Sequence, residues 1–331
     1  MTSTTQGTTR DTTQRTAQSQ GAEREILLVP HFYRPDNIEA AASAAGMLRD
    51  AGIRVRLLDQ GFREPDGGTS PVSSDPVLGQ LETVLPGPDA AAGCELVLVL
   101  GGDGTFLRAA GVARDQDIPV LGINLGHVGF LAEGEAESLD AALRQVVDRT
   151  YVVEERMTID VYVSAPDGEE IGRSWALNEC SIENIERNKV LDAVLEVDFR
   201  PVSAFGCDGV LISTPTGSTA YAFSAGGPVM WPALDAILVV PNNAHALFAK
   251  PLVVSPRSTV AVESDPSTGT AVAVMDGFRR IELPPGSRVE VIRGSRPVKW
   301  VRLDQRPFTD RLVRKFQLPV SGWRGPKYGL A

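Results

Sequence analysis

The first half of the chain alternates short apolar runs with segments whose apolar residues recur at helical spacing. The runs are typical of strands buried in a parallel sheet, and the spaced segments are typical of helices packed on such a sheet. The predicted strands are 24–30, 53–58, 94–100 and 118–123, and the predicted helices are 37–51, 106–112 and 138–147. Residues 61–92 are rich in Gly, Pro, Ser and Asp, which indicates a long connection with one short helix near 76–84. This order of elements predicts an α/β layer.

From residue 150 the pattern changes to an alternation of apolar and polar residues, which is typical of half-buried strands. The clearest examples are 157–164 and 191–199. An Asp276-Gly277 pair between two strand-like segments predicts a hairpin, and a second hairpin is predicted from 288–293 with 298–303. The predicted fold class is therefore an N-terminal α/β sandwich with a parallel sheet, followed by a C-terminal β-rich, sandwich-like domain.

The two ends of the chain differ from both halves. Residues 1–23 contain no Val, Ile, Leu or aromatic residue, so burial cannot offset the entropy of ordering them. We expect a disordered tail, and the alternative is a processed targeting peptide. At the other end, 308–318 returns to helical spacing and is predicted to pack back on the first domain.

Composition and charge exclude several classes of protein. The chain has 331 residues and a formal net charge of −10, from 32 basic and 42 acidic side chains, which argues against a general nucleic-acid binder. No apolar run approaches the roughly 20 residues that span a bilayer, so we expect no membrane-spanning segment. Cys94, Cys180 and Cys207 show no Cys-x-x-Cys spacing, which argues against a disulfide framework or a zinc site and favours a reducing cytoplasm.

The strongest chemical signal is the run Gly101-Gly102-Asp103-Gly104-Thr105, at the junction of a predicted strand and a predicted helix. Ligands bind at this edge of the sheet in α/β folds. Glycines let the backbone approach a ligand and the helix dipole attracts anions, so the run is predicted to hold a diphosphate, with Arg108 near the same anion. The GxxxxGK[ST] and GxGxxG nucleotide signatures are absent.

Asp103 needs a separate explanation, because a carboxylate beside a phosphate is repelled. The natural role is a general base that accepts the proton of an attacking hydroxyl during phosphoryl transfer. The alternative is a turn residue that caps the helix at Thr105. The position of Asp103 inside a five-residue loop at a strand-to-helix junction favours the base.

Two further segments carry polar groups suited to a nucleoside. In 205–221 an Asp-Gly pair precedes a strand, a hydroxyl-rich turn and a predicted helix from Ala220. The turn is suited to bind a base or ribose and Tyr221 to stack on a ring, and the alternative is a helix capped by Ser or Thr. In Asn178-Glu179 an adjacent amide and carboxylate suit ribose hydroxyls, and the alternative is an ordinary surface pair.

Other positions carry less chemistry. His31, His127 and His245 are isolated, so no protein metal site is assigned. The glycine-rich stretch 122–130 indicates a tight domain junction or a pocket wall, and Trp231 is interpreted as a core residue.

Taken together, these signals resemble the NAD kinases, from about Glu25 to the C-terminus. GGDGT at 101–105, Asn178-Glu179 and DGVLISTPTGSTAYAFSAGGPV at 208–229 follow the order and approximate spacing of that family. Diacylglycerol and sphingosine kinases share GGDGT but lack the long TPTGSTAY segment in this form. The alternatives are therefore a lipid or sphingoid-base kinase and a non-catalytic dinucleotide sensor.

The resemblance implies transfer of a phosphoryl group from ATP, or from inorganic polyphosphate in some members, to the 2′-hydroxyl of the adenosine ribose of NAD, giving NADP. It also implies Mg²⁺ or another divalent cation, held mainly by the substrate phosphates. Asp103 matches the base, and the phosphate loop comprises Gly101, Gly102, Gly104 and Thr105. The positions that match the family's NAD contacts are Asp103, Gly104, Arg108, Asn178, Glu179, Lys189, Asp208, Thr219, Ala220, Tyr221, Ala222, Phe223 and Ser224.

The resemblance also implies a domain division and an assembly. An α/β domain would comprise 24–148 with 304–331, and a β-rich NAD-binding domain would comprise 149–303. Members are homodimers or homotetramers in which a neighbouring subunit can complete the pocket. Gly206 stands where many bacterial members carry a basic residue, and 240–253 resembles actinobacterial members, which favours polyphosphate as an additional donor.

Overall fold

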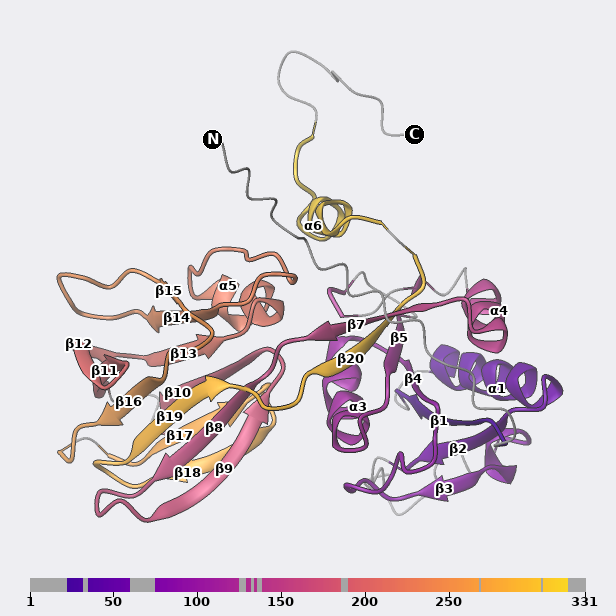
Figure 1. The fold of residues 1–331 in the computed structure, drawn as a ribbon, viewed down its shortest axis with the longest axis horizontal. Helices are drawn as coiled ribbons and strands as arrows, with labels where there is room; N and C mark the ends of the chain where they lie inside the picture. The colour runs from indigo at the N-terminus through magenta and orange to yellow at the C-terminus, as the bar shows by residue number, and fades with distance from the viewer. Residues whose placement is uncertain are drawn as a thin grey trace, which may run out of the picture.

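The computed structural model describes residues 23–31, 35–59, 75–124, 129–131, 134–135, 139–185, 190–267, 269–304 and 306–320. Nearly all of the predicted tail, part of the predicted connection 61–92, and Lys189 lie outside these residues. The chain folds into an α/β unit and a β-rich unit that lie side by side (Figure 1).

The α/β unit is built on a sheet with the order β3-β2-β1-β4-β5-β20-β7, to which β6 adds by pairing with β5. Helices α1 and α4 cover one face and α3 covers the other (Figure 1). Because both faces are covered, every side chain of β4 is apolar and buried. The strands are β1 (Glu25–Pro30), β2 (Arg54–Leu58), β3 (Glu82–Val84), β4 (Leu96–Leu100), β5 (Val120–Asn124), β6 (Gly134–Glu135), β7 (Val152–Arg156) and β20 (Val298–Arg302). The helices are α1 (Pro35–Asp50), α3 (Asp103–Asp115), α4 (Leu139–Asp148) and the short 3-10 helix η1 (Leu78–Gln80).

The β-rich unit consists of two antiparallel sheets with the orders β15-β14-β13-β10-β17-β18 and β12-β11-β16-β19-β8-β9. In β8 the apolar residues Ile159, Val161 and Val163 are buried and the polar residues between them are partly exposed, as the alternation predicts. Inward-facing residues of this kind form the core between the sheets. The strands are β8 (Ile159–Ser164), β9 (Glu170–Ala176), β10 (Glu179–Asn184), β11 (Leu191–Val197), β12 (Arg200–Cys207), β13 (Gly209–Ser213), β14 (Ile237–Asn242), β15 (Leu252–Val254), β16 (Val260–Ser264), β17 (Ala271–Met275), β18 (Arg279–Leu283) and β19 (Arg288–Arg293).

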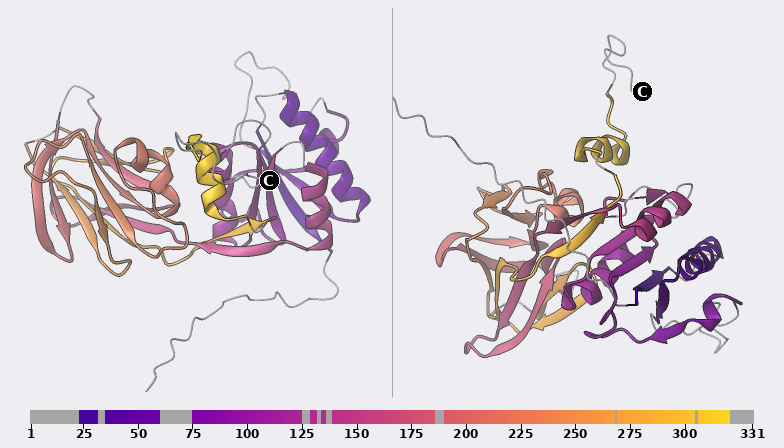
Figure 2. Two further views of the ribbon diagram at one scale, coloured as in Figure 1. Left: turned by 90° about the horizontal axis from the view of Figure 1, so that it is seen from above. Right: turned by 45° about the vertical axis from the view of Figure 1, so that its right-hand side comes forward.

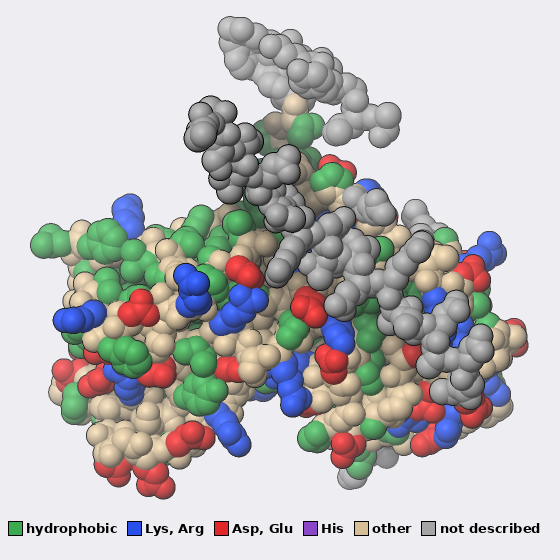
Figure 3. All heavy atoms as spheres, viewed as in Figure 1, with side chains coloured by type: hydrophobic (Ala, Val, Ile, Leu, Met, Phe, Trp, Pro, Cys, Tyr) green, Lys and Arg blue, Asp and Glu red, His purple; other side chains and the backbone are tan. Residues whose placement is uncertain are grey.

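These two units confirm the predicted fold class, and the pairing of β17 with β18 confirms the hairpin at Asp276-Gly277. The short helix expected near 76–84 is wrong in its second half, because β-branched residues of β3 pair there with β2. No helix among the described residues is long and apolar enough to cross a membrane. On the face drawn in Figure 3, acidic and basic side chains are interspersed rather than separated.

The second predicted hairpin, 288–293 with 298–303, is wrong. Strand β19 pairs with β8 and β16 in the β-rich unit, whereas β20 pairs with β5 and β7 in the α/β unit. Residues between β19 and β20 run beside those between β7 and β8: Gly294 donates to the Thr158 carbonyl at 2.7 Å, and the Thr158 hydroxyl donates to the Arg296 carbonyl at 2.6 Å. The chain therefore crosses between the units twice at one place, and β7 and β20, both within 149–303, belong to the first sheet.

The C-terminal helix α6 (Phe308–Phe316) lies between the units (Figures 1 and 2). Its Phe316 contacts Phe130 on the α/β side and Phe223 on the β-rich side, with ring centroids 5.4 Å and 4.5 Å apart. The predicted packing on the first domain is thus confirmed, and the helix also packs on the β-rich unit, which was not predicted. Trp231, interpreted as core, is 47 % exposed and packs edge-on against Phe308 of α6.

Candidate functional site

Asp103 is the first residue of α3, and its carboxylate is held by the loop that follows β5. The carboxylate accepts hydrogen bonds from the backbone N–H groups of Phe130 at 3.1 Å and Leu131 at 3.0 Å. Gly102 occupies the N-cap without a side-chain cap, and the N–H of Thr105 bonds the Gly102 carbonyl. Asp103 therefore does not cap the helix at Thr105, and its side chain is positioned by a distant loop.

Two glycines allow the close packing around Asp103. A Cβ on Gly129 would lie 2.2 Å from an oxygen of the Asp103 carboxylate, so any side chain there would displace one or the other. A Cβ on Gly101 would lie 3.0 Å from the Thr105 hydroxyl and 3.1 Å from the Cβ of His31. The interpretation of 122–130 as a pocket wall agrees with the part of that stretch that the structure describes.

Asn178 and Glu179 lie where the turn after β9 leads into β10, and they are only 7 % and 6 % exposed. The alternative of an ordinary surface pair is therefore wrong. The carboxylate of Asp276 accepts hydrogen bonds from the backbone N–H groups of Leu177 at 3.0 Å and Asn178 at 2.7 Å, and it pairs with Arg279. Sequence reasoning took Asp276 only as a hairpin residue, because an Asp-Gly turn has the same local pattern whether its carboxylate meets water or a buried neighbour.

The pKa values of two buried carboxylates at this turn, Glu179 and Asp276, are raised. Burial raises the pKa of Glu179 to about 8, and the nearby negative charge of Asp276 adds to that rise, while a hydrogen bond from the backbone of Tyr221 opposes it. Burial also raises the pKa of Asp276, opposed mainly by Arg279. The Oδ1 of Asn178 and the Oε2 of Glu179 are buried without a hydrogen-bond partner among the described residues. Such acceptors are suited to receive hydroxyl groups from a ligand.

A pair of guanidinium groups connects this turn to α3. Arg279, the partner of Asp276, lies over the ring of Trp175 at 4.1 Å, and Arg114 of α3 lies over the same ring at 4.4 Å. Leu177 belongs to the same core cluster as Phe106 of α3. The helix that begins with Asp103 and the turn that carries Asn178 are therefore packed on one another.

The hydroxyl-rich segment forms a 3-10 helix, η3 (Thr216–Thr219), and a single helical turn, α5 (Tyr221–Ser224). The predicted helix from Ala220 is thus a single turn. The hydroxyls of Ser213 and Thr214 donate to the carbonyls of Asn178 at 3.0 Å and Leu177 at 2.5 Å. A Cβ on Gly217 would lie 2.1 Å from the Asn178 carbonyl oxygen. Much of the polar character of this segment therefore holds it against the Asn178 turn.

The other residues predicted to contact NAD differ in exposure and in distance from Asn178. Tyr221 is 41 % exposed and its phenol bonds Glu183. Asp208 is exposed, accepts from the Asn243 amide at 2.7 Å, and stands at the opposite end of β13 from Ser213, roughly 16 Å away at about 3.3 Å per residue. Arg108 is exposed on α3 and makes no ion pair with a described residue. Ala222 is buried, Ala220 is partly exposed, and Phe223, Ser224 and Gly104 are exposed.

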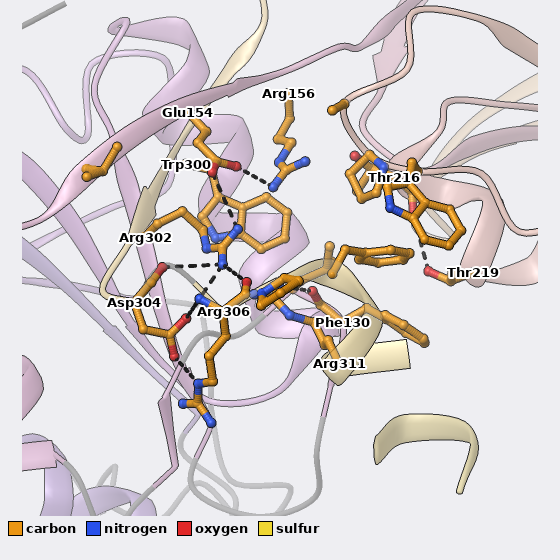
Figure 4. Close-up of a pocket in the computed structure, with 17 residues that line it drawn as sticks. Phe130, Glu154, Arg156, Thr216, Thr219, Trp300, Arg302, Asp304, Arg306 and Arg311 are labelled. Atoms are coloured by element: carbon orange, nitrogen blue, oxygen red, sulfur yellow. Dashed lines mark hydrogen bonds and ion pairs between the residues drawn. The ribbon is translucent and has the colours of Figure 1, made fainter. Parts of the chain in front are cut away.

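A cavity of about 510 Å³ lies between the units, lined by residues of β7, β20 and η3 and by the segment after β20 (Figure 4). Its wall includes Phe130 and Leu131, whose N–H groups hold Asp103, and Thr216 and Thr219 of η3. Sequence reasoning did not identify its charged lining: Glu154, Arg156, Arg302, Asp304, Arg306 and Arg311. These residues lie far apart along the chain, and no motif connects them.

Comparison with known proteins identifies relatives along most of the chain. Family models described as the ATP-NAD kinase N-terminal domain and the ATP-NAD kinase C-terminal domain match residues 65–151 and 177–303. The NAD kinase of Corynebacterium efficiens is 68 % identical over 92 % of this chain and 94 % of its own. The NAD kinase of Rhodococcus erythropolis is 60 % identical over 94 % of this chain and 99 % of its own.

Two solved structures share the fold. Yeast NADH kinase complexed with NADH superimposes with a TM-score of 0.78 at 21 % identity, covering 92 % of this chain and 90 % of that one. An NAD kinase from Archaeoglobus fulgidus in complex with ATP superimposes with a TM-score of 0.66 at 24 % identity, covering 89 % of this chain and 99 % of that one.

Proposed function

Because the chain belongs to the NAD kinase family, we propose that it transfers the γ-phosphoryl group of ATP to the 2′-hydroxyl of the adenosine ribose of NAD, giving NADP. The observation that carries this proposal is the position of Asp103. Its carboxylate is fixed by two backbone N–H groups at the start of α3, on the glycine-rich phosphate loop.

Asp103 is the general base in this reaction. The 2′-oxygen bonds to the γ-phosphorus while the bond from that phosphorus to the β–γ bridging oxygen breaks, and the hydroxyl proton passes to the Asp103 carboxylate. Gly101, Gly102, Gly104 and Thr105 form the phosphate loop at the positive end of α3. Gly102 and Gly104 offer backbone amides to the phosphates, whereas the N–H groups of Gly101 and Thr105 bond the carbonyls of Ile123 and Gly102 and fix the shape of the loop. Support comes from Gly129, whose missing side chain leaves room for the carboxylate.

Asn178 and Glu179 bind the ribose hydroxyls of NAD. The Asn178 Oδ1 and the Glu179 Oε2 have no hydrogen-bond partner among the described residues, which supports this role. Both residues are also buried, so water does not compete freely for these oxygens. Thr219 to Ser224 line the adenosine, with Tyr221 placed to stack on a ring. Arg108 is within one helical turn of the phosphate loop, and Lys189 is retained as a contact on the resemblance of its position alone.

Magnesium is proposed as the divalent cofactor. The described residues include no group of three or more His, Cys, Asp or Glu that could hold a metal, so the phosphates of ATP would be its main ligands, with Asp103 the nearest carboxylate of the loop. When bound, the ion neutralises charge on the transferring group. Inorganic polyphosphate is proposed as an additional donor, because it presents the same phosphoanhydride bond.

We place the enzyme in the cytoplasm as a homodimer or homotetramer. The resemblance to the family supports the assembly, in which Asp208, an exposed carboxylate separated from Asn178 by the length of β13, would serve the site of a neighbouring subunit. The three cysteines among the described residues are free and buried, in keeping with a reducing compartment.

The test is an assay of NADP formation from NAD, ATP and Mg²⁺, with a diacylglycerol and a sphingoid base as alternative acceptors. Asp103→Asn should lower kcat by about 10²–10⁴-fold, the contribution typical of a general base, while calorimetry still detects NAD binding. Asp115→Asn, at the exposed end of the same helix, is the matched control and should retain full activity. Full activity in Asp103→Asn, or phosphorylation of a lipid in place of NAD, would refute the proposal.

A further inference from the structure

Four arginines surround the cavity between the units. Arg156 comes from β7, Arg302 from β20, Arg306 from the segment after β20, and Arg311 from α6. Two carboxylates, Glu154 and Asp304, share the lining, so the charged lining carries a formal charge of +2 in a chain whose net charge is −10. We call this cavity the arginine pocket.

Each arginine of the pocket also has a partner within the protein: Arg156 pairs with Glu154 at 2.6 Å, and Arg311 donates to the Phe130 carbonyl at 3.0 Å. Arg302 lies 3.4 Å from Glu154 and 3.6 Å from Asp304, longer than a charge-assisted hydrogen bond, and Arg306 pairs with Asp304 at 2.6 Å (Figure 4). Guanidinium groups bind phosphate oxygens in pairs, which makes a cluster of arginines better suited to a phosphate chain than to a single carboxylate. A phosphate chain offers more oxygens than the two carboxylates of the lining, so it could contact several of the four guanidinium groups at once.

Two uncharged features add donors to the same cavity. The indole N–H of Trp300 is buried without a hydrogen-bond partner among the described residues, and the side chain is 2 % exposed and lines the pocket. The N-terminus of α6 also opens there, because Arg306, Pro307 and Phe308 line the pocket and Pro307 provides no side-chain cap. A buried donor and an uncapped helix start both favour an anion.

The location of the arginine pocket connects it to the reaction. Phe130 and Leu131 form part of its wall. The backbone N–H groups of the same two residues donate hydrogen bonds to the carboxylate of Asp103. Thr216 and Thr219 form another part of the wall, and Thr219 is also the first residue of the segment proposed for adenosine. A phosphate chain in this cavity would therefore lie beside the loop that holds the general base.

We propose that the arginine pocket binds the oligophosphate chain of the phosphoryl donor, with Arg306 as a contact that any donor shares. This inference rests on the proposed function for its place in the reaction, but binding itself can be measured without turnover. A volume of about 510 Å³ lies within the range of about 300–1,000 Å³ typical of small-molecule sites. ATP and inorganic tripolyphosphate carry the same chain, so both should compete for the pocket, whereas adenosine should not.

The experiment uses Arg306→Gln in the full chain. The Arg306 side chain is 64 % exposed, so its replacement should leave the fold intact. We expect the KM for ATP and the dissociation constant for inorganic tripolyphosphate, measured by calorimetry, to rise about threefold to tenfold, the effect of one charge-assisted bond at a partly exposed site. The KM for NAD should change by less than about twofold, because Arg306 is not among the residues assigned to NAD.

Two variants control this result. Arg306→Lys keeps the charge and should recover part of the affinity, and Arg257→Gln removes an exposed arginine before β16 and should behave as the wild type. The inference would be overturned by unchanged tripolyphosphate affinity in Arg306→Gln, or by a rise confined to the KM for NAD. A protein that binds tripolyphosphate through Arg306 yet makes no NADP would contradict the proposed function and leave the pocket assigned.

Discussion

Replacement of Glu179 by glutamine should make the stability of the folded protein less dependent on pH. Burial and the negative charge of Asp276 raise the pKa of Glu179 to about 8, whereas the same group in an unfolded chain has an ordinary value near 4.5. Between these values the folded state keeps a proton that the unfolded state releases. The contribution of Glu179 to stability is therefore fully present below about pH 4.5 and is lost as the pH rises through about 8.

The size of the effect follows from the same two values. The difference between 4.5 and about 8 corresponds to about 5 kcal/mol, since each tenfold change in an equilibrium is worth about 1.4 kcal/mol. Relaxation and water entry around the ionised group reduce such penalties, so we expect about 2–5 kcal/mol. Whole domains are stable by about 5–15 kcal/mol, so this loss is large enough to measure directly.

Urea unfolding followed by tryptophan fluorescence, between pH 5 and pH 9 without substrates, provides the measurement. Glu179→Gln keeps the shape of the protonated side chain and cannot ionise, so its free energy of unfolding should exceed that of the wild type by an amount that grows from pH 5 to about pH 8 and then levels off. Glu282→Gln, on the exposed face of β18, is the matched control and should follow the wild type. Parallel pH profiles for Glu179→Gln and the wild type would refute the assignment of a buried, neutral Glu179.

Three other changes test the positioning of the site. Gly129→Ala should lower kcat by about tenfold to a hundredfold with an unchanged circular dichroism spectrum, because its Cβ would lie 2.2 Å from the Asp103 carboxylate and small misplacements of reacting groups are costly; activity within twofold of wild type would contradict this. Asp276→Asn should lower the free energy of unfolding by about 3–5 kcal/mol and raise the KM for NAD, because it leaves Arg279 without its buried partner and weakens support for the Asn178 turn; urea unfolding and steady-state kinetics measure both, and an unchanged KM would separate Asp276 from the site. Phe316→Ala removes ring contacts with Phe130 and Phe223, each worth about 0.5–1.5 kcal/mol, so hydrogen exchange in 308–316 should accelerate, and unchanged exchange would show that these rings do not hold α6.

Local pattern was sufficient for most of the fold. The apolar run of β4 and the alternation of β8 each express which faces of a strand are covered, and this information is present in a few consecutive residues. The pairing partner of β20 cannot be predicted from nearby residues, because residues 294–297 have the composition of a hairpin turn. The hydrogen bonds that hold this segment where the chain passes from one unit to the other come from Thr158, far away in sequence. The short α5 has a similar explanation: Gly226, with φ of +87°, ends the helix that hydroxyl residues appeared to start.

The candidate site divides in the same way. Asp103 and Asn178-Glu179 were identified from the sequence because each lies in a compact motif whose chemistry is unusual for its position. Asp276 and Arg302 were not, since one has the pattern of an ordinary turn and the other that of a charged residue at the end of a strand. Their roles arise only when distant segments meet, as when β7 pairs with β20 and brings Glu154 toward Arg302.

The double crossing between the units limits how they can move. A single linker would allow one unit to swivel in any direction, whereas here two segments run side by side, bonded through Gly294, Thr158 and Arg296. Arg114 of α3 donates to the Arg296 carbonyl at 2.9 Å and pairs with Asp160 at 3.1 Å, so the crossing is also fastened to the helix that begins with Asp103. Such a double strap resists twisting and sliding but can still bend. We therefore expect any relative motion of the units to be a bend about this double strap, which would keep Asp103 and Asn178 in a reproducible relative placement.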